Sequence, residues 1–172
     1  MAITPDTKDW TWVLRRPCPE CGFTADNTTP AAVASTIPAL LPRWQGALKR
    51  QDADVRPDDS TWSTLEYACH VRDVFGVFEA RLNLMLGQDN PTFADWDQDQ
   101  AAVDGDYAGQ DPAVVARELA QAGTDAASAF ASVTEEDWGR RGLRSNGSAF
   151  TVLTLSQYFL HDVIHHLHDV HA

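Results

Sequence analysis

Five of the six histidines in this chain lie within its last twelve residues. His161 and His165 are four positions apart, a spacing that on a helix brings both rings to one face, with Cβ atoms about 5–6 Å apart. Two such imidazoles can bind one divalent metal ion. The remaining histidine, His70, belongs to a second helical segment. The sequence therefore predicts a metal site formed by His70, His161 and His165, with His166 and His171 facing away from it.

Three neutral imidazoles would leave the ion its full positive charge and an open coordination position. A bound water or thiol then loses its proton near neutral pH. Two carboxylates flank His70: Glu66 precedes it by one turn and Asp73 follows it by nearly one turn. Either could orient an imidazole by accepting its N–H, and Glu66 could serve as a general base. Both are candidate catalytic residues, and the alternative for each is an exposed helical charge.

The densest positive cluster is formed by Arg140, Arg141 and Arg144. It lies in a turn-rich connection before the last helical segment. Its functional interpretation is a set of cofactor-binding residues that contact polar or anionic groups of a cofactor or substrate. The alternative is a solvated loop.

The cysteines are Cys18, Cys21 and Cys69. An odd number in a chain of cytosolic character argues against a disulfide framework. The segment Cys18-Pro19-Glu20-Cys21-Gly22 resembles half of a zinc ribbon, but the chain has no second pair. Three interpretations remain open. We favour buried small residues in a tight turn, followed by metal ligands completed by Cys69 or a histidine, and then a redox pair.

Apolar residues recur at spacings of three and four in several long segments, which is typical of amphipathic helices. No segment alternates as a strand would. Pro38 and Pro42 should kink or restart the first helix. The pattern predicts an all-α fold, an antiparallel four-helix bundle. The expected helices are 30–50, 60–87, 112–132 and 150–171, in a domain spanning 30–172 and preceded by an irregular arm, 1–29, packed on the body.

The composition excludes several partners. A formal net charge of −12 disfavours nucleic acid, whose phosphates need a basic surface, and it equally disfavours anionic membranes. No apolar run approaches the roughly 20 residues of a membrane span. The first residues lack the features of a signal peptide. We expect a cytoplasmic protein that acts on a small molecule.

With His70 in the second helix and His161 and His165 in the last, the chain resembles the DinB-like superfamily of metal-dependent four-helix-bundle proteins. The resemblance covers about residues 30–171. It implies that the histidines bind zinc, nickel or a similar ion, and that the protein forms a homodimer. The superfamily includes transferases and isomerases that use mycothiol, bacillithiol or glutathione. In its maleylpyruvate isomerase branch a glutamate takes one ligand position of the last helix, a position that we match to His161.

The sequence supports three hypotheses. The first is a metal-dependent transferase, in which the ion activates a low-molecular-weight thiol such as mycothiol. The second is a metal-dependent hydrolase, in which the ion activates water. The third is a non-catalytic binding or stress-response module, in which the ion only fastens two helices together.

Overall fold

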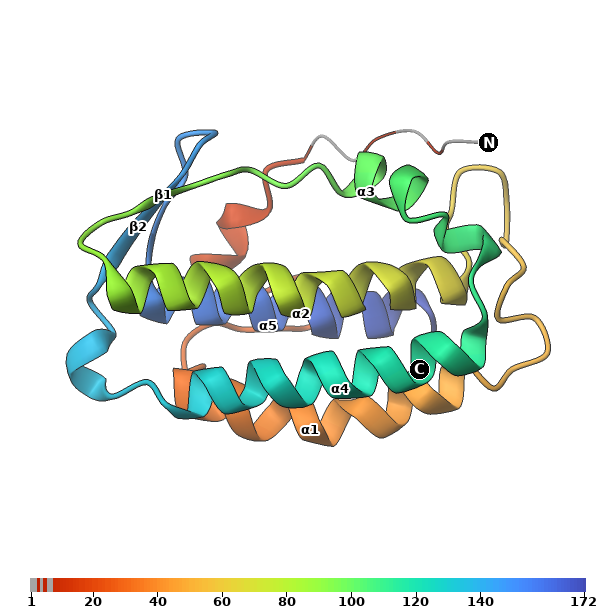
Figure 1. The fold of residues 1–172 in the computed structure, drawn as a ribbon, viewed down its shortest axis with the longest axis horizontal. Helices are drawn as coiled ribbons and strands as arrows, with labels where there is room; N and C mark the ends of the chain where they lie inside the picture. The colour runs from red at the N-terminus through yellow and green to blue at the C-terminus, as the bar shows by residue number, and fades with distance from the viewer. Residues whose placement is uncertain (1–2, 4, 6–7) are drawn as a thin grey trace.

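The computed structural model describes residues 3, 5 and 8–172. Within this part of the chain, four long helices form the body of the molecule (Figure 1). They are α1 (Pro30–Ala47), α2 (Thr64–Gly87), α4 (Pro112–Ala131) and α5 (Val152–Asp169). A shorter helix, α3 (Gln98–Asp104), and three 3₁₀ turns, η1 (Trp10–Leu14), η2 (Tyr107–Gly109) and η3 (Glu135–Asp137), occupy the connections. The expected helical bundle is therefore confirmed.

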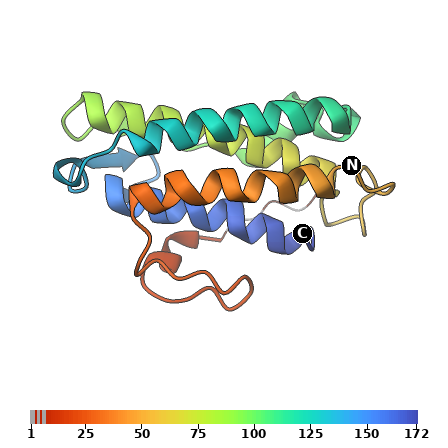
Figure 2. The ribbon, with the colours of Figure 1, turned by 90° about the horizontal axis from the view of Figure 1, so that it is seen from below.

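The direction of the helices departs from strict alternation. In Figures 1 and 2, α1 and α5 run one way, whereas α2 and α4 both run the other way. The ion pair between Arg72, early in α2, and Glu118, early in α4, agrees with this parallel arrangement. The physical reason is the connection 88–111, which is long enough to cross the whole molecule before α4 begins. The expectation of an all-antiparallel bundle is corrected accordingly.

Helix α1 continues through both of its prolines instead of breaking. Pro38 and Pro42 are exposed, while Ile37, Leu41 and Trp44 are buried. The carbonyls that lose their helical partner at each proline therefore lie on the solvent side, where water can hydrate them. The expectation that the helix restarts at these prolines is therefore wrong.

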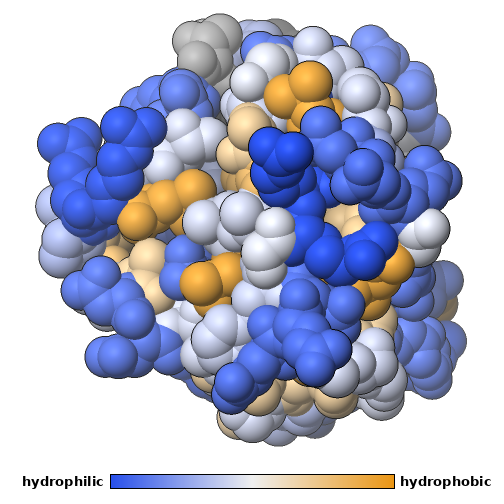
Figure 3. Space-filling view, turned by 90° about the vertical axis from the view of Figure 1, so that its left-hand side faces the viewer, coloured by the Kyte–Doolittle hydropathy of each residue, from blue (hydrophilic) through white to orange (hydrophobic). Residues whose placement is uncertain are grey.

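A small sheet closes one end of the bundle, which the sequence pattern did not predict. It consists of β1 (Thr92–Phe93), β2 (Arg141–Arg144) and β3 (Ala149–Thr151), in the order β1-β2-β3. β1 pairs parallel with β2, and β2 pairs antiparallel with β3. The strands are too short for alternation to stand out in a sequence. The surface at this end is largely hydrophilic, with apolar groups scattered over it (Figure 3).

The core fixes the position of α5. Phe159 of α5 stacks on Phe78 of α2 with ring centroids 5.1 Å apart, and on Phe130 of α4 at 5.0 Å. Phe75 meets the same ring edge-on at 5.9 Å. Because large buried aromatic rings resist displacement, the residues that follow Phe159 on α5 are held in a defined orientation. Among the described helices, none combines the length and apolar character needed to cross a bilayer.

Candidate metal centre

Helix α5 carries two pairs of metal-binding side chains on neighbouring faces. His161 and His165 form one pair, and Asp162 and His166 form the other. Successive helical residues are rotated by about 100°, so the two pairs point to different surroundings. The structure places each pair in its own cluster of close ligand atoms. We call these the His70 cluster (His70, Asp162 and His166) and the Cys18 cluster (Cys18, Cys21, His161 and His165).

The His70 cluster joins α2 to α5. Its three ligand atoms all lie within 4.8 Å of one another. The Oδ1 atom of Asp162 is 3.5 Å from Nε2 of His70 and 3.7 Å from Nε2 of His166. Ligands bound at about 2.1 Å in a tetrahedral arrangement are separated by about 3.4 Å. The side chains therefore already stand near the separations that one small divalent ion requires.

Three buried polar atoms in this cluster form no hydrogen bond. Both ring nitrogens of His70 and Oδ1 of Asp162 have no hydrogen bond within the part of the chain that the structure describes. His70 is only 1% exposed, and its ring lies near Trp96 at 5.3 Å and Trp62 at 5.5 Å. An unsatisfied buried polar group costs free energy. Coordination of a cation would remove that cost, so these residues fit a metal.

The protonation states also suit metal binding. Burial lowers the pKa of His70, which keeps the imidazole neutral and its lone pair available. Burial alone would raise the pKa of Asp162, but the neighbouring His166 and His70 outweigh it and hold this pKa at about 2. The cluster thus offers the neutral imidazole of His70 and the carboxylate of Asp162, with the ring of His166 beside them.

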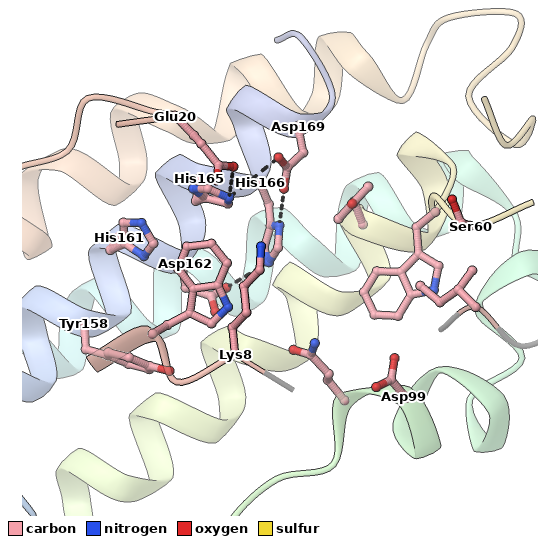
Figure 4. Close-up of a pocket in the computed structure, with 15 residues that line it drawn as sticks. Lys8, Glu20, Ser60, Asp99, Tyr158, His161, Asp162, His165, His166 and Asp169 are labelled. Atoms are coloured by element: carbon pink, nitrogen blue, oxygen red, sulfur yellow. Dashed lines mark hydrogen bonds and ion pairs between the residues drawn. The ribbon is translucent and has the colours of Figure 1, made fainter. Parts of the chain in front are cut away.

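A cavity of about 290 Å³ opens beside both pairs of α5 (Figure 4). Asp169 lies between them: its carboxylate is 2.8 Å from Nδ1 of His166 and 3.7 Å from Nε2 of His165. The cavity is lined by four carboxylates, those of Glu20, Asp99, Asp162 and Asp169, and by the ammonium group of Lys8. Trp10, Trp62, Tyr67 and Tyr158 contribute aromatic surface.

The Cys18 cluster joins the N-terminal arm to α5. Its four ligand atoms also lie within 4.8 Å of one another. The Sγ atom of Cys18 is 3.6 Å from Nδ1 of His165. Burial lowers the pKa of His161 to about 4 and raises that of the Cys21 thiol to about 11.

The three histidines predicted from sequence are therefore divided between two clusters. His70 does not join His161 and His165 within 4.8 Å; its neighbours are Asp162 and His166. His166, expected to face away, meets His70 edge-on with ring centroids 4.8 Å apart. The missed pair has the same four-residue spacing as the predicted one. Sequence reasoning passed over it because it counted histidines and gave no weight to an aspartate at the first position.

Glu66 belongs to neither cluster. Its carboxylate accepts hydrogen bonds from Nε of Arg56 at 2.8 Å and from the backbone N–H of Ser63 at 2.9 Å. The second bond is part of the capping box that begins α2. Burial would raise the pKa of Glu66, but these bonds outweigh it and hold the pKa below its usual value. Glu66 is thus a buried carboxylate occupied by structural contacts.

Asp73 is likewise occupied outside the two clusters. It accepts a hydrogen bond from the Tyr107 hydroxyl and another from Nε of Arg72 at 2.8 Å. These contacts attach the crossover connection to α2. Asp73 also lines a separate surface pocket, together with Trp96.

The three candidate arginines have different surroundings. Arg140, directly before β2, donates hydrogen bonds to the backbone carbonyls of Met85 and Gln88. It thereby connects the β2–β3 pair to the end of α2. Arg141 is exposed on β2. Arg144 contacts Tyr158 through its guanidinium, 5.7 Å from the ring centroid, and lines a second cavity that shares Tyr158 with the first. Only Arg144 therefore stands near the candidate centre.

Comparisons with known proteins agree with this architecture. The model of the DinB superfamily matches residues 33–170. A similar solved structure is YfiT from Bacillus subtilis, described as a probable metal-dependent hydrolase with an unusual four-helix bundle topology. It has 18% sequence identity and a TM-score of 0.68, and the match covers 81% of each chain. At this identity the likeness concerns the fold. No curated protein matches the sequence.

Proposed function

Because the chain belongs to the DinB superfamily, we propose that it is a metal-dependent enzyme that transfers a low-molecular-weight thiol to an electrophile. The observation that carries the proposal is the His70 cluster. Both ring nitrogens of His70 and Oδ1 of Asp162 are buried without a hydrogen bond in the described part of the chain, and Asp162 and His166 line a cavity. A bound divalent ion would supply a Lewis acid that lowers the pKa of a thiol or water. Two imidazoles and a carboxylate form a ligand set common in catalytic zinc sites.

The residues around the cluster prepare it for this role. In the metal-bound form, Nδ1–H of His166 would donate its hydrogen bond to Asp169, which leaves the Nε2 lone pair of that ring on the side of Asp162. Trp62 and Trp96 pack beside His70 and keep water from its ring. The ligands come from α2 and α5, whose separation is set by the aromatic core. The cluster is therefore rigid before any ion binds.

The charge of the cavity indicates the class of thiol. Its lining carboxylates would repel glutathione, which carries two carboxylates of its own. A neutral, hydroxyl-rich thiol such as mycothiol avoids this repulsion, and its hydroxyl groups can donate hydrogen bonds to Asp99 or Glu20. Asp162 supplies an acidic ligand one position after His161, the residue matched above to the glutamate of the maleylpyruvate isomerase branch.

The experiment compares the metal-loaded protein with Asp162→Asn and His166→Ala. We expect conjugation of mycothiol to a chlorinated aromatic acceptor in the wild type, and at least a 100-fold loss of kcat/KM in both variants. His168→Ala, at an exposed position of the same helix, is the matched control and should keep the wild-type rate. Metal content measured on each protein shows whether the loss follows the loss of the ion.

A hydrolase is the second candidate. It is favoured by the ligand set and by the description of YfiT. A panel of ester, amide and phosphoester substrates, assayed before and after chelation, separates the two reactions. Chelator-sensitive hydrolysis without any thiol conjugation would replace the first proposal by the second. If neither activity depends on metal although His166→Ala loses the ion, the cluster only fastens helices.

A further inference from the structure

The Cys18 cluster has the composition of a closed zinc site. We propose that Cys18, Cys21, His161 and His165 bind one zinc ion with no open position, and that this ion fastens the N-terminal arm to α5. Four protein ligands of the Cys₂His₂ type are typical of structural zinc. Two thiolates balance the charge of Zn²⁺, so the site is neutral overall and can be buried without a large electrostatic cost.

The distances in the cluster agree with shared coordination. With Zn–S about 2.3 Å and Zn–N about 2.05 Å, a tetrahedral ion separates a sulfur and a nitrogen ligand by about 3.6 Å. The separation of Cys18 Sγ from His165 Nδ1 is 3.6 Å. His165 directs its other nitrogen, Nε2, toward Glu20 at 3.5 Å and Asp169 at 3.7 Å. Such a carboxylate orients a zinc-binding imidazole by accepting its N–H.

A buried atom without a partner points to a missing ligand. The Nε2 atom of His161 has no hydrogen bond in the described part of the chain, and the residue is only 3% exposed. Phe23 and Trp10 surround this ring, with centroids 5.5 Å and 5.7 Å away. Neither ring forms a hydrogen bond with that nitrogen. A zinc ion shared with the two cysteines would satisfy it.

The backbone of the arm is shaped to present both thiols. The N–H of Cys18 donates to the carbonyl of Phe23, and the N–H of Gly22 donates to the carbonyl of Cys18, each at 2.9 Å. Gly22 has φ +75°, a conformation that favours glycine and reverses the chain directly after Cys21. The turn thus brings Cys18 and Cys21 to the same side, opposite the two histidines of α5.

The proposed zinc site would set one wall of the neighbouring cavity. Trp10 and Glu20 belong to the same arm and line that cavity. Trp10 also packs against His165 at 4.9 Å. The two clusters lie on adjacent faces of α5. The ion of the closed Cys18 cluster would stabilise the arm, and the ion of the His70 cluster would take part in the proposed reaction. The closed site depends only on the residues of the Cys18 cluster and is independent of the proposed reaction.

The test uses the full chain loaded with zinc or cobalt. We expect the wild type to bind zinc and, with cobalt, to show thiolate-to-metal charge-transfer bands together with the visible bands of tetrahedral cobalt. Cys18→Ser and Cys21→Ser should each lose one equivalent of metal and weaken the charge-transfer bands. Cys69→Ala, which changes the remaining thiol, should retain both. His166→Ala should lose the other ion but keep the thiolate bands, which separates the two sites.

Two further outcomes decide the proposal if the serine variants fail to fold. In the wild type, a thiol reagent should label Cys18 and Cys21 slowly with zinc bound and rapidly after chelation. Cobalt binding without thiolate bands, or labelling that does not respond to chelation, would overturn the site. A Cys18–Cys21 disulfide in the purified protein without bound zinc, detected by intact mass, would overturn it as well.

Discussion

At the scale of single residues, neighbours decide what each polar side chain can do. Glu66 on α2 and Asp162 on α5 are both carboxylates, yet their partners differ. Glu66 is held by Arg56 and Ser63, whereas Asp162 faces His70 and His166. The first carboxylate therefore contributes to stability, and the second belongs to the proposed metal site.

Replacing Glu66 by Gln tests this distinction. We expect the free energy of unfolding at pH 7 to fall by about 1–3 kcal/mol, because the charge-assisted bonds to Arg56 are lost. The folded pKa of Glu66 is lowered, so its contribution is present above the unfolded pKa of about 4.3. It disappears as the pH falls through the folded value. Urea unfolding at pH 7 and at acid pH should show the difference from wild type shrinking in acid.

Glu136→Gln, the same change at an exposed position, should leave the unfolding free energy nearly unchanged. Activity provides the opposing outcome for Glu66→Gln. If Glu66 were the general base, kcat would fall about 100-fold or more at unchanged stability, and the structural role would be rejected.

At the scale of elements, close packing of three helices holds α2 and α5 in register for the metal ligands. Gly123 of α4 lies between Leu41 of α1 and Phe75 of α2. A Cβ atom at this position would stand 2.6 Å from Cδ2 of Leu41 and 3.0 Å from Cε2 of Phe75. The ring of Phe75 in turn packs on Phe159, which orients α5. The absence of a side chain at one position thus supports the geometry of the site.

Gly123→Ala should therefore destabilise the protein by about 1–2 kcal/mol, since overpacking outweighs the gain in helix propensity. Gly76→Ala, at an exposed position of α2 with nothing within 4 Å of the new Cβ, should instead stabilise it by about 0.5–1 kcal/mol. Thermal unfolding of the two variants measures the contrast. Equal shifts in both would mean that α4 does not approach α1 and α2 as closely as described.

At the scale of the whole molecule, the parallel course of α2 and α4 and the strongly acidic charge shape the cavity together. The crossover 88–111 brings Gln98 and Asp99 to the cavity from one side, while the arm supplies Trp10 and Glu20 from another. The net charge of −12 adds to the local carboxylates and disfavours anionic ligands.

The proposed transferase should for this reason prefer mycothiol to glutathione by about 10-fold or more in kcat/KM at low ionic strength. Raising the salt concentration to about 0.5 M should narrow the preference, because screening weakens repulsion between the cavity and the anionic thiol. Steady-state rates with both thiols at two salt concentrations measure the effect. A preference for glutathione, or one that ignores salt, would contradict an electrostatic basis.

The sequence by itself determined the helical body and the placement of metal-binding side chains on α2 and α5. Both depend on local spacing, since apolar residues at steps of three and four define helices, and side chains four apart share a face. The glycine-terminated turn of Cys18 and Cys21 was also visible as a metal-binding possibility.

Only the tertiary structure decided which of these side chains meet. Cys18 and His165 are separated by 147 positions, so no local pattern relates them. His165 and His166 are adjacent in sequence but belong to different clusters, because a rotation of about 100° between neighbours directs one toward the arm and the other toward α2. The orientation of α5 about its own axis is fixed by its packing on Phe78 and Phe130, a long-range contact that helical periodicity alone does not specify.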